Sequence, residues 1–186
     1  MIKKYKRPLL AAVLAVAAVL ALVGPATASA TVWKDGGTTV TKEFSIGVTG
    51  PQNYEMENSA GGIQCSEHFT LKFNGVSTTT LGTFENKGCT TFGTYKTCTV
   101  QNVEAIGAPW AVTLEPTALK ITSFHIKHTF KAGCPKGEIN QTLNVTMTPN
   151  STSSITELNT FGTSGTFKQF GTFTVDSPNS GTYGIG

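Results

Sequence analysis

The strongest constraint on the fold is a two-residue alternation of apolar and polar side chains in short segments bounded by Gly, Pro or Asn. In the clearest case, Ile63, Cys65, Phe69 and Leu71 alternate with polar neighbours. This period places successive side chains on opposite faces and is typical of a half-buried β-strand. Composition agrees, because residues 31–186 contain 30 Thr but only six Leu and six Ala, and no helical window is convincing. The sequence therefore predicts an all-β fold.

Nine or ten predicted strands follow one another at close spacing, which favours an antiparallel β-sandwich or, as the alternative, a β-barrel. The predicted strands are 40–48, 63–73, 78–84, 97–106, 110–114, 119–130, 139–147, 153–158, 166–175 and 182–185. Gly50-Pro51 is expected to end the first strand, and Asn74-Gly75 is expected to form a turn. The predicted core residues are Phe44, Ile46, Phe69, Leu71, Val112, Leu114, Phe124, Ile126, Leu143 and Val145.

Residues 1–30 have the three-part pattern of a secretory signal peptide: a basic start, an apolar run and a small-residue Ala-x-Ala site. The apolar run is about 15 residues, short of the roughly 20 needed to span a membrane. We expect a signal-peptide helix that is cleaved between Ala30 and Thr31, with Ala28 as the alternative site. The mature chain, 31–186, is expected to be one domain, secreted and without a membrane span. The Ala- and Val-rich leader is typical of a bacterial protein.

The charge balance argues against a nucleic-acid partner. Four of the 14 basic residues lie in the leader, so the remainder has ten basic and eleven acidic residues and no arginine. Proteins that bind nucleic acids need a basic face, usually with arginine, to contact phosphates and bases. Nucleic-acid binding is therefore largely excluded.

The four cysteines, Cys65, Cys89, Cys98 and Cys134, all lie after the leader, and an even number in an exported chain predicts two disulfides. A hairpin that turns near Phe92-Gly93 would bring Cys89 to Cys98 and leave Cys65 for Cys134. This pairing is favoured over Cys65–Cys89 with Cys98–Cys134, and over the interleaved pairing. A zinc site would need closely spaced cysteine pairs, and none exists.

No catalytic, cofactor-binding or metal-binding residue is assigned. His125 and His128 point to opposite faces of a strand, and His128 falls in an apolar row, where a satisfied, half-buried histidine is expected. His68 is expected on the solvated face of its strand. Glu55 and Glu57 have the spacing of a carboxylate pair, but solvated side chains are the simpler interpretation. We predict no cofactor.

Aromatic side chains give the case for binding. Trp33, Tyr54, Tyr95, Trp110 and Tyr183 have rings of the kind that stack on sugars, although Trp110 lies in phase with core residues. Phe-Gly-Thr occurs at Phe92, Phe161 and Phe170, at irregular spacing. Turn and edge-strand composition explains that motif without a repeat.

The chain resembles a family of small secreted, cysteine-containing β-proteins of actinobacteria and related high-GC Gram-positive bacteria. The resemblance covers about 33–110 and rests on Cys, Gly and Trp spacing, at Trp33-Lys34-Asp35-Gly36, Gly62-Ile63-Gln64-Cys65, Gly88-Cys89, Cys98-Thr99-Val100 and Gly107-Ala108-Pro109-Trp110. The family has no assigned activity, so the resemblance implies no functional residues.

These observations favour an exported, non-catalytic β-domain, either a surface-associated or a ligand-binding module. Its partner is unknown, and a cell-surface component or a carbohydrate is the class left open. The alternative is a small secreted hydrolase whose site cannot be localised from the sequence.

Overall fold

The computed structural model describes residues 30–56, 60–74, 79–176 and 181–186, and within them the chain is all-β, as predicted. Three predicted features lie outside these residues: the leader apart from Ala30, the carboxylate candidate Glu57, and the turn position Gly75. The strands are β1 (Trp33–Asp35), β2 (Thr38–Thr39), β3 (Phe44–Met56), β4 (Gly61–Phe73), β5 (Thr79–Phe92), β6 (Val100–Ala105), β7 (Trp110–Glu115), β8 (Ala118–Phe130), β9 (Glu138–Pro149), β10 (Glu157–Ser164), β11 (Phe167–Val175) and β12 (Tyr183–Ile185). One 3-10 turn, η1 (Gly93–Tyr95), follows β5.

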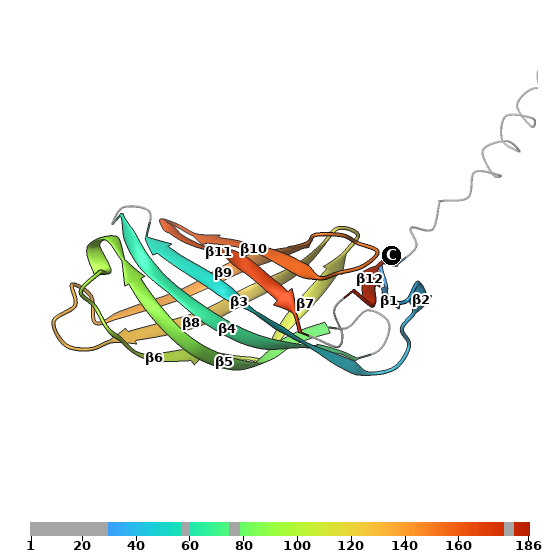
Figure 1. Ribbon diagram of the computed structural model, residues 1–186, viewed down its shortest axis with the longest axis horizontal. Coiled ribbons are helices and arrows are strands. Elements are labelled where there is room, and N and C mark those ends of the chain that lie inside the picture. The colour runs from blue at the N-terminus through green and yellow to red at the C-terminus, as the bar shows by residue number, and fades with distance from the viewer. Residues whose placement is uncertain (1–29, 57–59, 75–78, 177–180) are drawn as a thin grey trace, which may run out of the picture. The chain divides into compact units, whose positions relative to one another are not determined.

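The strands form a closed antiparallel barrel, so the barrel alternative is correct and the sandwich is not (Figure 1). Eight strands pair in the order β8-β7-β5-β4-β3-β11-β10-β9, and a β8–β9 ladder closes the circle. β6 pairs with β8 beyond the end of β7, so β6 and β7 lie one after the other along the same edge of β8.

The first long strand does not end at Gly50-Pro51, contrary to the prediction. β3 continues to Met56, and Pro51 lies opposite Ser66 of β4. On its other side, β3 pairs with β11 at Gln52 and Thr49 but not at the two residues between them. Proline lacks an N–H donor, so it interrupts this ladder locally without ending the strand.

The predicted core is largely confirmed. Eight of its ten side chains are buried, and Phe44 and Leu114 are partly buried against the others. β8 contributes two inward rows because its register shifts between Ile121 and Phe124, where Ser123 has a φ of 59°. A β-bulge at this point reverses the alternation, so Leu119 and Ile121 face inward together with Phe124 and Ile126.

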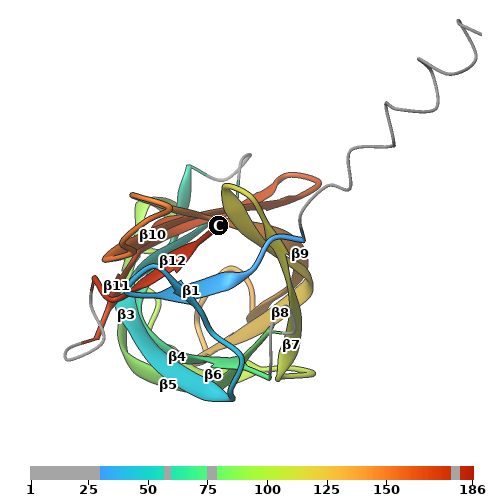
Figure 2. The same ribbon diagram turned by 90° about the vertical axis from the view of Figure 1, so that its right-hand side faces the viewer.

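Aromatic side chains close the two ends of the barrel. β1, β2 and β12 form a small sheet across one end (Figure 2). There Trp33, 1% exposed, packs against Phe73 and donates its indole N–H to Thr79 Oγ1 at 2.9 Å. Elsewhere Tyr95 of η1 stacks on Phe130 with ring centroids 5.7 Å apart. Apolar side chains of the barrel strands are buried in the interior between them.

Two disulfides form, as predicted, but the favoured pairing of the cysteines is wrong. Cys65 bonds to Cys89 and Cys98 bonds to Cys134. Cys65 and Cys89 are direct cross-strand partners in the β4–β5 ladder. The expected hairpin between Cys89 and Cys98 is absent from the described sheets, because β6 pairs with β8 and not with β5. The two disulfides place the folded chain in an oxidising environment.

The close approach of β3 and β11 gives a first test. A methyl group at Gly50 would overlap the Thr172 carbonyl oxygen, whereas nothing lies within 4 Å of one at Gly137. We expect Gly50→Ala to lower the free energy of unfolding by roughly 1–3 kcal/mol through overpacking. Gly137→Ala is the control and should change it little. Urea denaturation measures both, and equal stability of the two variants would contradict this account.

The disulfide pairing gives a second test. The bridged cysteines are 24 and 36 residues apart, which in the loop-entropy model corresponds to about 3.4 and 3.8 kcal/mol. Cys65 is also fully buried, and its truncation removes roughly 1 kcal/mol of packing. Cys65→Ala with Cys89→Ala should therefore destabilise the protein at least as much as Cys98→Ala with Cys134→Ala. Non-reducing peptide mapping checks the pairing, and a Cys89–Cys98 peptide would refute it.

Candidate functional site

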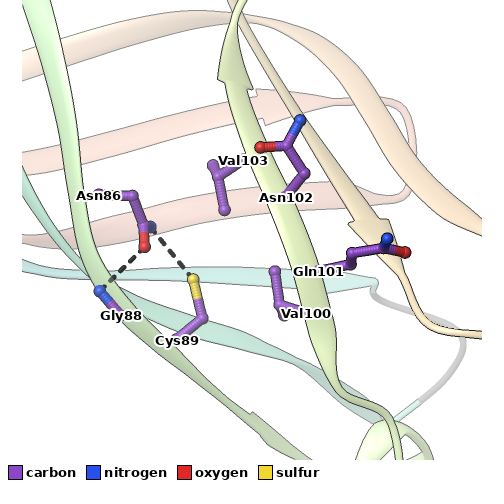
Figure 3. A pocket seen from close by; sticks show the side chains of 7 residues that line it. All are labelled: Asn86, Gly88, Cys89, Val100, Gln101, Asn102 and Val103. Carbon is purple, nitrogen blue, oxygen red and sulfur yellow. Dashed lines mark hydrogen bonds between the residues drawn. The ribbon is translucent and has the colours of Figure 1, made fainter.

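A seam runs through the barrel wall where β5 and β6 face each other. β5 pairs with β7 only over Thr79–Leu81, and no ladder joins its later part to β6 among the described strands. A pocket of about 230 Å³ lies in this seam (Figure 3). Its lining residues are Asn86, Gly88 and Cys89 on β5 and Val100, Gln101, Asn102 and Val103 on β6.

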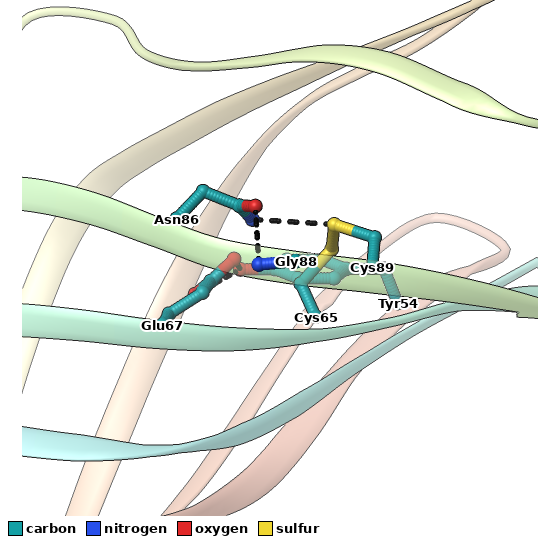
Figure 4. The surroundings of a disulfide bond; sticks show 6 residues. All are labelled: Tyr54, Cys65, Glu67, Asn86, Gly88 and Cys89. Atoms are coloured by element: carbon teal, nitrogen blue, oxygen red, sulfur yellow. Dashed lines mark hydrogen bonds between the residues drawn. A yellow bond between two sulfur atoms is a disulfide. The ribbon is translucent and has the colours of Figure 1, made fainter.

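A local turn of β5 sets the floor of the seam pocket. The β4–β5 register shifts between Ser66 and Glu67, and Gly88 has a φ of 129°. Asn86 holds this irregular segment: its Oδ1 accepts the Gly88 N–H at 2.9 Å, and its Nδ2 donates to Cys89 Sγ at 3.2 Å (Figure 4). The Cys65–Cys89 disulfide therefore lies between the pocket and the barrel interior.

Inside the barrel, Glu67 is fully buried and contacts Tyr54. The Tyr54 hydroxyl donates to the Glu67 carboxyl and lies 2.9 Å from Oε1 and 2.8 Å from Oε2. Burial raises the pKa of Glu67 to about 8, although the Tyr54 hydrogen bond works in the opposite direction. Burial, together with the nearby Glu67, also raises the pKa of Tyr54 well above its usual value. At neutral pH both groups are therefore mainly protonated.

His128 completes the inner cluster. Its ring lies 4.5 Å from that of Tyr54 between centroids, and burial lowers its pKa to about 4. The side chain is 0% exposed, and neither ring nitrogen has a hydrogen-bond partner. The expectation of a half-buried, satisfied histidine was therefore wrong. One ligand atom each of Cys65, Glu67 and His128 lies within 4.8 Å of the others.

A second cluster of buried polar side chains lies on β3, β10 and β11. Gln52 Oε1 accepts hydrogen bonds from the Thr160 hydroxyl, at 2.6 Å, and from Gln169 Nε2. Gln52 lies opposite Cys65 in the β3–β4 ladder, and Gln169 lies opposite Tyr54 in the β3–β11 ladder. The two polar groups therefore form one layer across the barrel interior.

The outer surface of the barrel carries a different candidate site, a row of side chains that crosses six neighbouring strands. Each member pairs across the strands with the next one. We call this set the aromatic row: Thr146, Phe161, Phe170, Asn53, Gln64 and Thr90. Phe161 is 55% exposed and is the one large hydrophobic side chain classed as exposed in the described part of the chain. The row ends at a hollow of about 320 Å³ that includes Gln64 and Thr90 in its lining.

Glycines explain the Phe-Gly-Thr motif at Phe161 and Phe170. The phenylalanines pair across β10 and β11 on the outer face, which turns Gly162 and Gly171 toward the interior. A methyl group at Gly171 would overlap the Pro51 carbonyl oxygen and meet Gln52. The motif thus combines an outer aromatic side chain with room for close strand packing.

Most of the aromatic residues proposed for sugar stacking are core residues. Trp33, Tyr54, Tyr95 and Trp110 are buried, and Tyr183 stacks on Phe44 at 4.5 Å between ring centroids. The sequence reasoning missed Phe161 and Glu67. A signal for Glu67 was present, because it occupies the apolar parity of the strand that contains Cys65 and Phe69.

The remaining titratable candidates lie apart from these sites. His68 Nε2 lies 3.2 Å from Asp176 Oδ2, and its Nδ1, 4.0 Å from Glu85, has no hydrogen-bond partner, so no hydroxyl is placed against it as a nucleophile. His125 Nε2 is 2.5 Å from Asn140 Oδ1. Glu55 faces outward at the end of β3, and its predicted partner Glu57 lies outside the described residues.

Comparison with known proteins does not add to this picture: no family model, curated protein or solved structure matches the chain. Across residues 30–56, 60–74, 79–176 and 181–186, no helix is long and apolar enough to cross a membrane.

The buried carboxyl predicts a pH dependence of stability. Between pH 6.5 and 8 the folded protein, in which the pKa of Glu67 is about 8, binds more of this proton than the unfolded chain, with a pKa near 4.5. Because the folded state binds more protons, stability falls as pH rises, by roughly 1 kcal/mol over this interval. His128 opposes this trend, most strongly below pH 6.5, because the unfolded chain takes up its proton first.

Glu67→Gln should remove this alkaline loss of stability while keeping the side-chain volume. Glu104→Gln, a change at an exposed carboxylate, is the control and should retain it. The measurement is urea denaturation at pH 6.5, 7.2 and 8.0 with the disulfides intact and a chelator present. Parallel pH profiles for the wild type and Glu67→Gln would contradict the assignment.

Proposed function

We propose that the protein is an exported, non-catalytic bacterial binding module that contacts a neutral polysaccharide through the aromatic row. The observation that carries the proposal is the 55% exposure of Phe161, beside Phe170, in a cross-strand row whose other members are amide and hydroxyl side chains. Export is supported by the signal-peptide pattern of residues 1–30 and by two disulfides. Kinship with the small secreted proteins of actinobacteria is part of the same proposal.

The chemistry of the row suits a sugar polymer. The apolar faces of sugar rings stack on exposed aromatic side chains, and their hydroxyls need donors and acceptors nearby. Asn53 Nδ2 donates to the Phe170 carbonyl oxygen at 3.4 Å, and Gln64 Nε2 donates to Asn53 Oδ1 at 3.0 Å. This chain of hydrogen bonds fixes the two amides in the row next to Phe170, and Gln64, whose side chain is exposed, offers its carbonyl oxygen as an acceptor.

Shape and charge narrow the class of ligand. The row itself has no charged side chain. Beside it, Lys168 pairs across the strands with Glu55, so opposite charges lie together at its edge and no single sign of charge dominates there. The closed barrel curves along the row, so an extended ligand contacts only neighbouring members. From Phe161 on β10 to Asn53 on β3 there are two strand-to-strand steps of about 4.8 Å, or roughly 10 Å. An extended, uncharged polymer that crosses the strands matches this surface better than a small molecule does, because small molecules favour enclosed pockets.

The barrel interior is less suited to a ligand. Eight-stranded barrels that bind a small ligand hold it in an interior cavity that opens at one end of the barrel. Here the large side chains of Trp33, Phe69, Phe124 and Phe173 are buried between the strands and occupy part of that space. Binding is therefore assigned to the outer face.

Removal of the two rings tests the proposal. Phe161→Ala with Phe170→Ala should abolish retention on insoluble cellulose, chitin or mannan, because truncating central aromatic contacts costs more than 2 kcal/mol of binding. The control is Thr113→Ala, a change at an exposed position of β7, which should leave binding unchanged. Thermal melts of all variants check folding. The proposal would be refuted if the wild type bound none of the three polymers, or if the double variant were retained as strongly as the wild type.

A further inference from the structure

We propose that reduction of the Cys65–Cys89 disulfide creates a zinc site inside the barrel, with Cys65, Cys89, Glu67 and His128 as its four ligands. The ligand atoms of Cys65, Glu67 and His128 already lie within 4.8 Å of one another, and the Cys89 sulfur is bonded to that of Cys65. Two thiolates, one imidazole and one carboxylate form a donor set that zinc prefers in proteins.

Three of the four ligands need only a small contraction. Tetrahedral zinc with bonds of 2.0–2.3 Å places its ligand atoms about 3.3–3.8 Å apart, so the spacing of up to 4.8 Å among Cys65, Glu67 and His128 must shrink by about 1 Å. Cys89 lies outside this group of three, so its sulfur must turn inward from its position in the disulfide. Reduction permits this movement, because it releases the two sulfurs from each other. Cys65 on β4 and Cys89 on β5 stay aligned by the ladder between these strands.

His128 is the observation that points to a ligand. Its two ring nitrogens have no hydrogen-bond partner although the side chain is 0% exposed. A buried polar atom without a partner is costly, and an ion that accepts the imidazole lone pair removes that cost at one of the two nitrogens. The Tyr54 hydroxyl supports the site from behind, since it already holds the Glu67 carboxyl in place.

The seam gives the metal a route to the site. Cys89 lines the seam pocket on one side and bonds to buried Cys65 on the other. No ladder joins β5 to β6 along this part of the described wall, so the seam opens without breaking strand-to-strand hydrogen bonds. A reductant and then an ion can therefore reach the sulfurs while the barrel stays closed elsewhere.

The chemistry balances with an external reductant. Two molecules of a thiol reduce the disulfide by two electrons, which gives the two cysteine thiols and one disulfide of the reductant. When Zn²⁺ binds, both cysteine thiols release their protons to solvent, as does the carboxyl wherever it is protonated. Three anionic ligands then offset the two positive charges of the ion.

The test compares oxidised and phosphine-reduced protein in titrations with Zn²⁺, and with Co²⁺ as a spectroscopic probe. We expect one ion per reduced chain, a Co²⁺ spectrum of tetrahedral sulfur ligation, and no binding by the oxidised protein. His128→Gln and Glu67→Gln should each weaken binding by at least about ten-fold. The matched control is His125→Gln on the same strand, which should bind as the wild type does.

Several outcomes would overturn the proposal. Equal affinity of the His128→Gln and wild-type proteins would mean that thiols of an unfolded chain hold the ion. Binding by the oxidised protein would remove the role of the disulfide. If reduction unfolds the barrel and Zn²⁺ does not restore its circular dichroism, the site does not form. Cys98→Ala with Cys134→Ala should keep the Zn²⁺ stoichiometry, and its loss would assign the metal to the other pair.

Discussion

The β3–β11 ladder is the interaction on which the rest of the structure depends, because it joins strands more than one hundred residues apart and links β3, β4 and β5 to β9, β10 and β11 in one barrel. Two facing glycines, Gly50 and Gly171, allow the backbones to approach at the point where Pro51 withholds a hydrogen bond. Closure removes the open edges that an unpaired sheet would expose. It also sets the outer face, since the same register that turns Gly171 inward turns Phe170 outward.

Polar side chains inside a closed barrel lose their hydrogen bonds to water, which costs free energy. In this protein two features reduce that cost. Gln52, Thr160 and Gln169 share hydrogen bonds, whereas Glu67 and His128 stay neutral because burial disfavours their charged forms. The polar layer adjoins the seam between β5 and β6, where the described strands form no ladder. Disulfide, carboxyl and imidazole are thus gathered behind that seam.

The two proposals use opposite faces of the same strands. On the outside, Asn53 and Gln64 of β3 and β4 belong to the aromatic row; on the inside, Tyr54 and Cys65, their chain neighbours, belong to the inner cluster. This follows from the two-residue alternation of a strand. A change at an outer residue therefore leaves the inner cluster in place, and the two sites can be tested independently.

From the sequence, the alternation of side chains determined the all-β class and most of the core, because it reports locally which face of a strand is buried. The even number of cysteines likewise predicted two disulfides. Tertiary structure decided the disulfide pairing, the barrel instead of a sandwich, the passage of β3 through Pro51 and the exposure of Phe161. Each of these depends on which distant strand lies beside which, and the alternation along one strand carries no information about its neighbour.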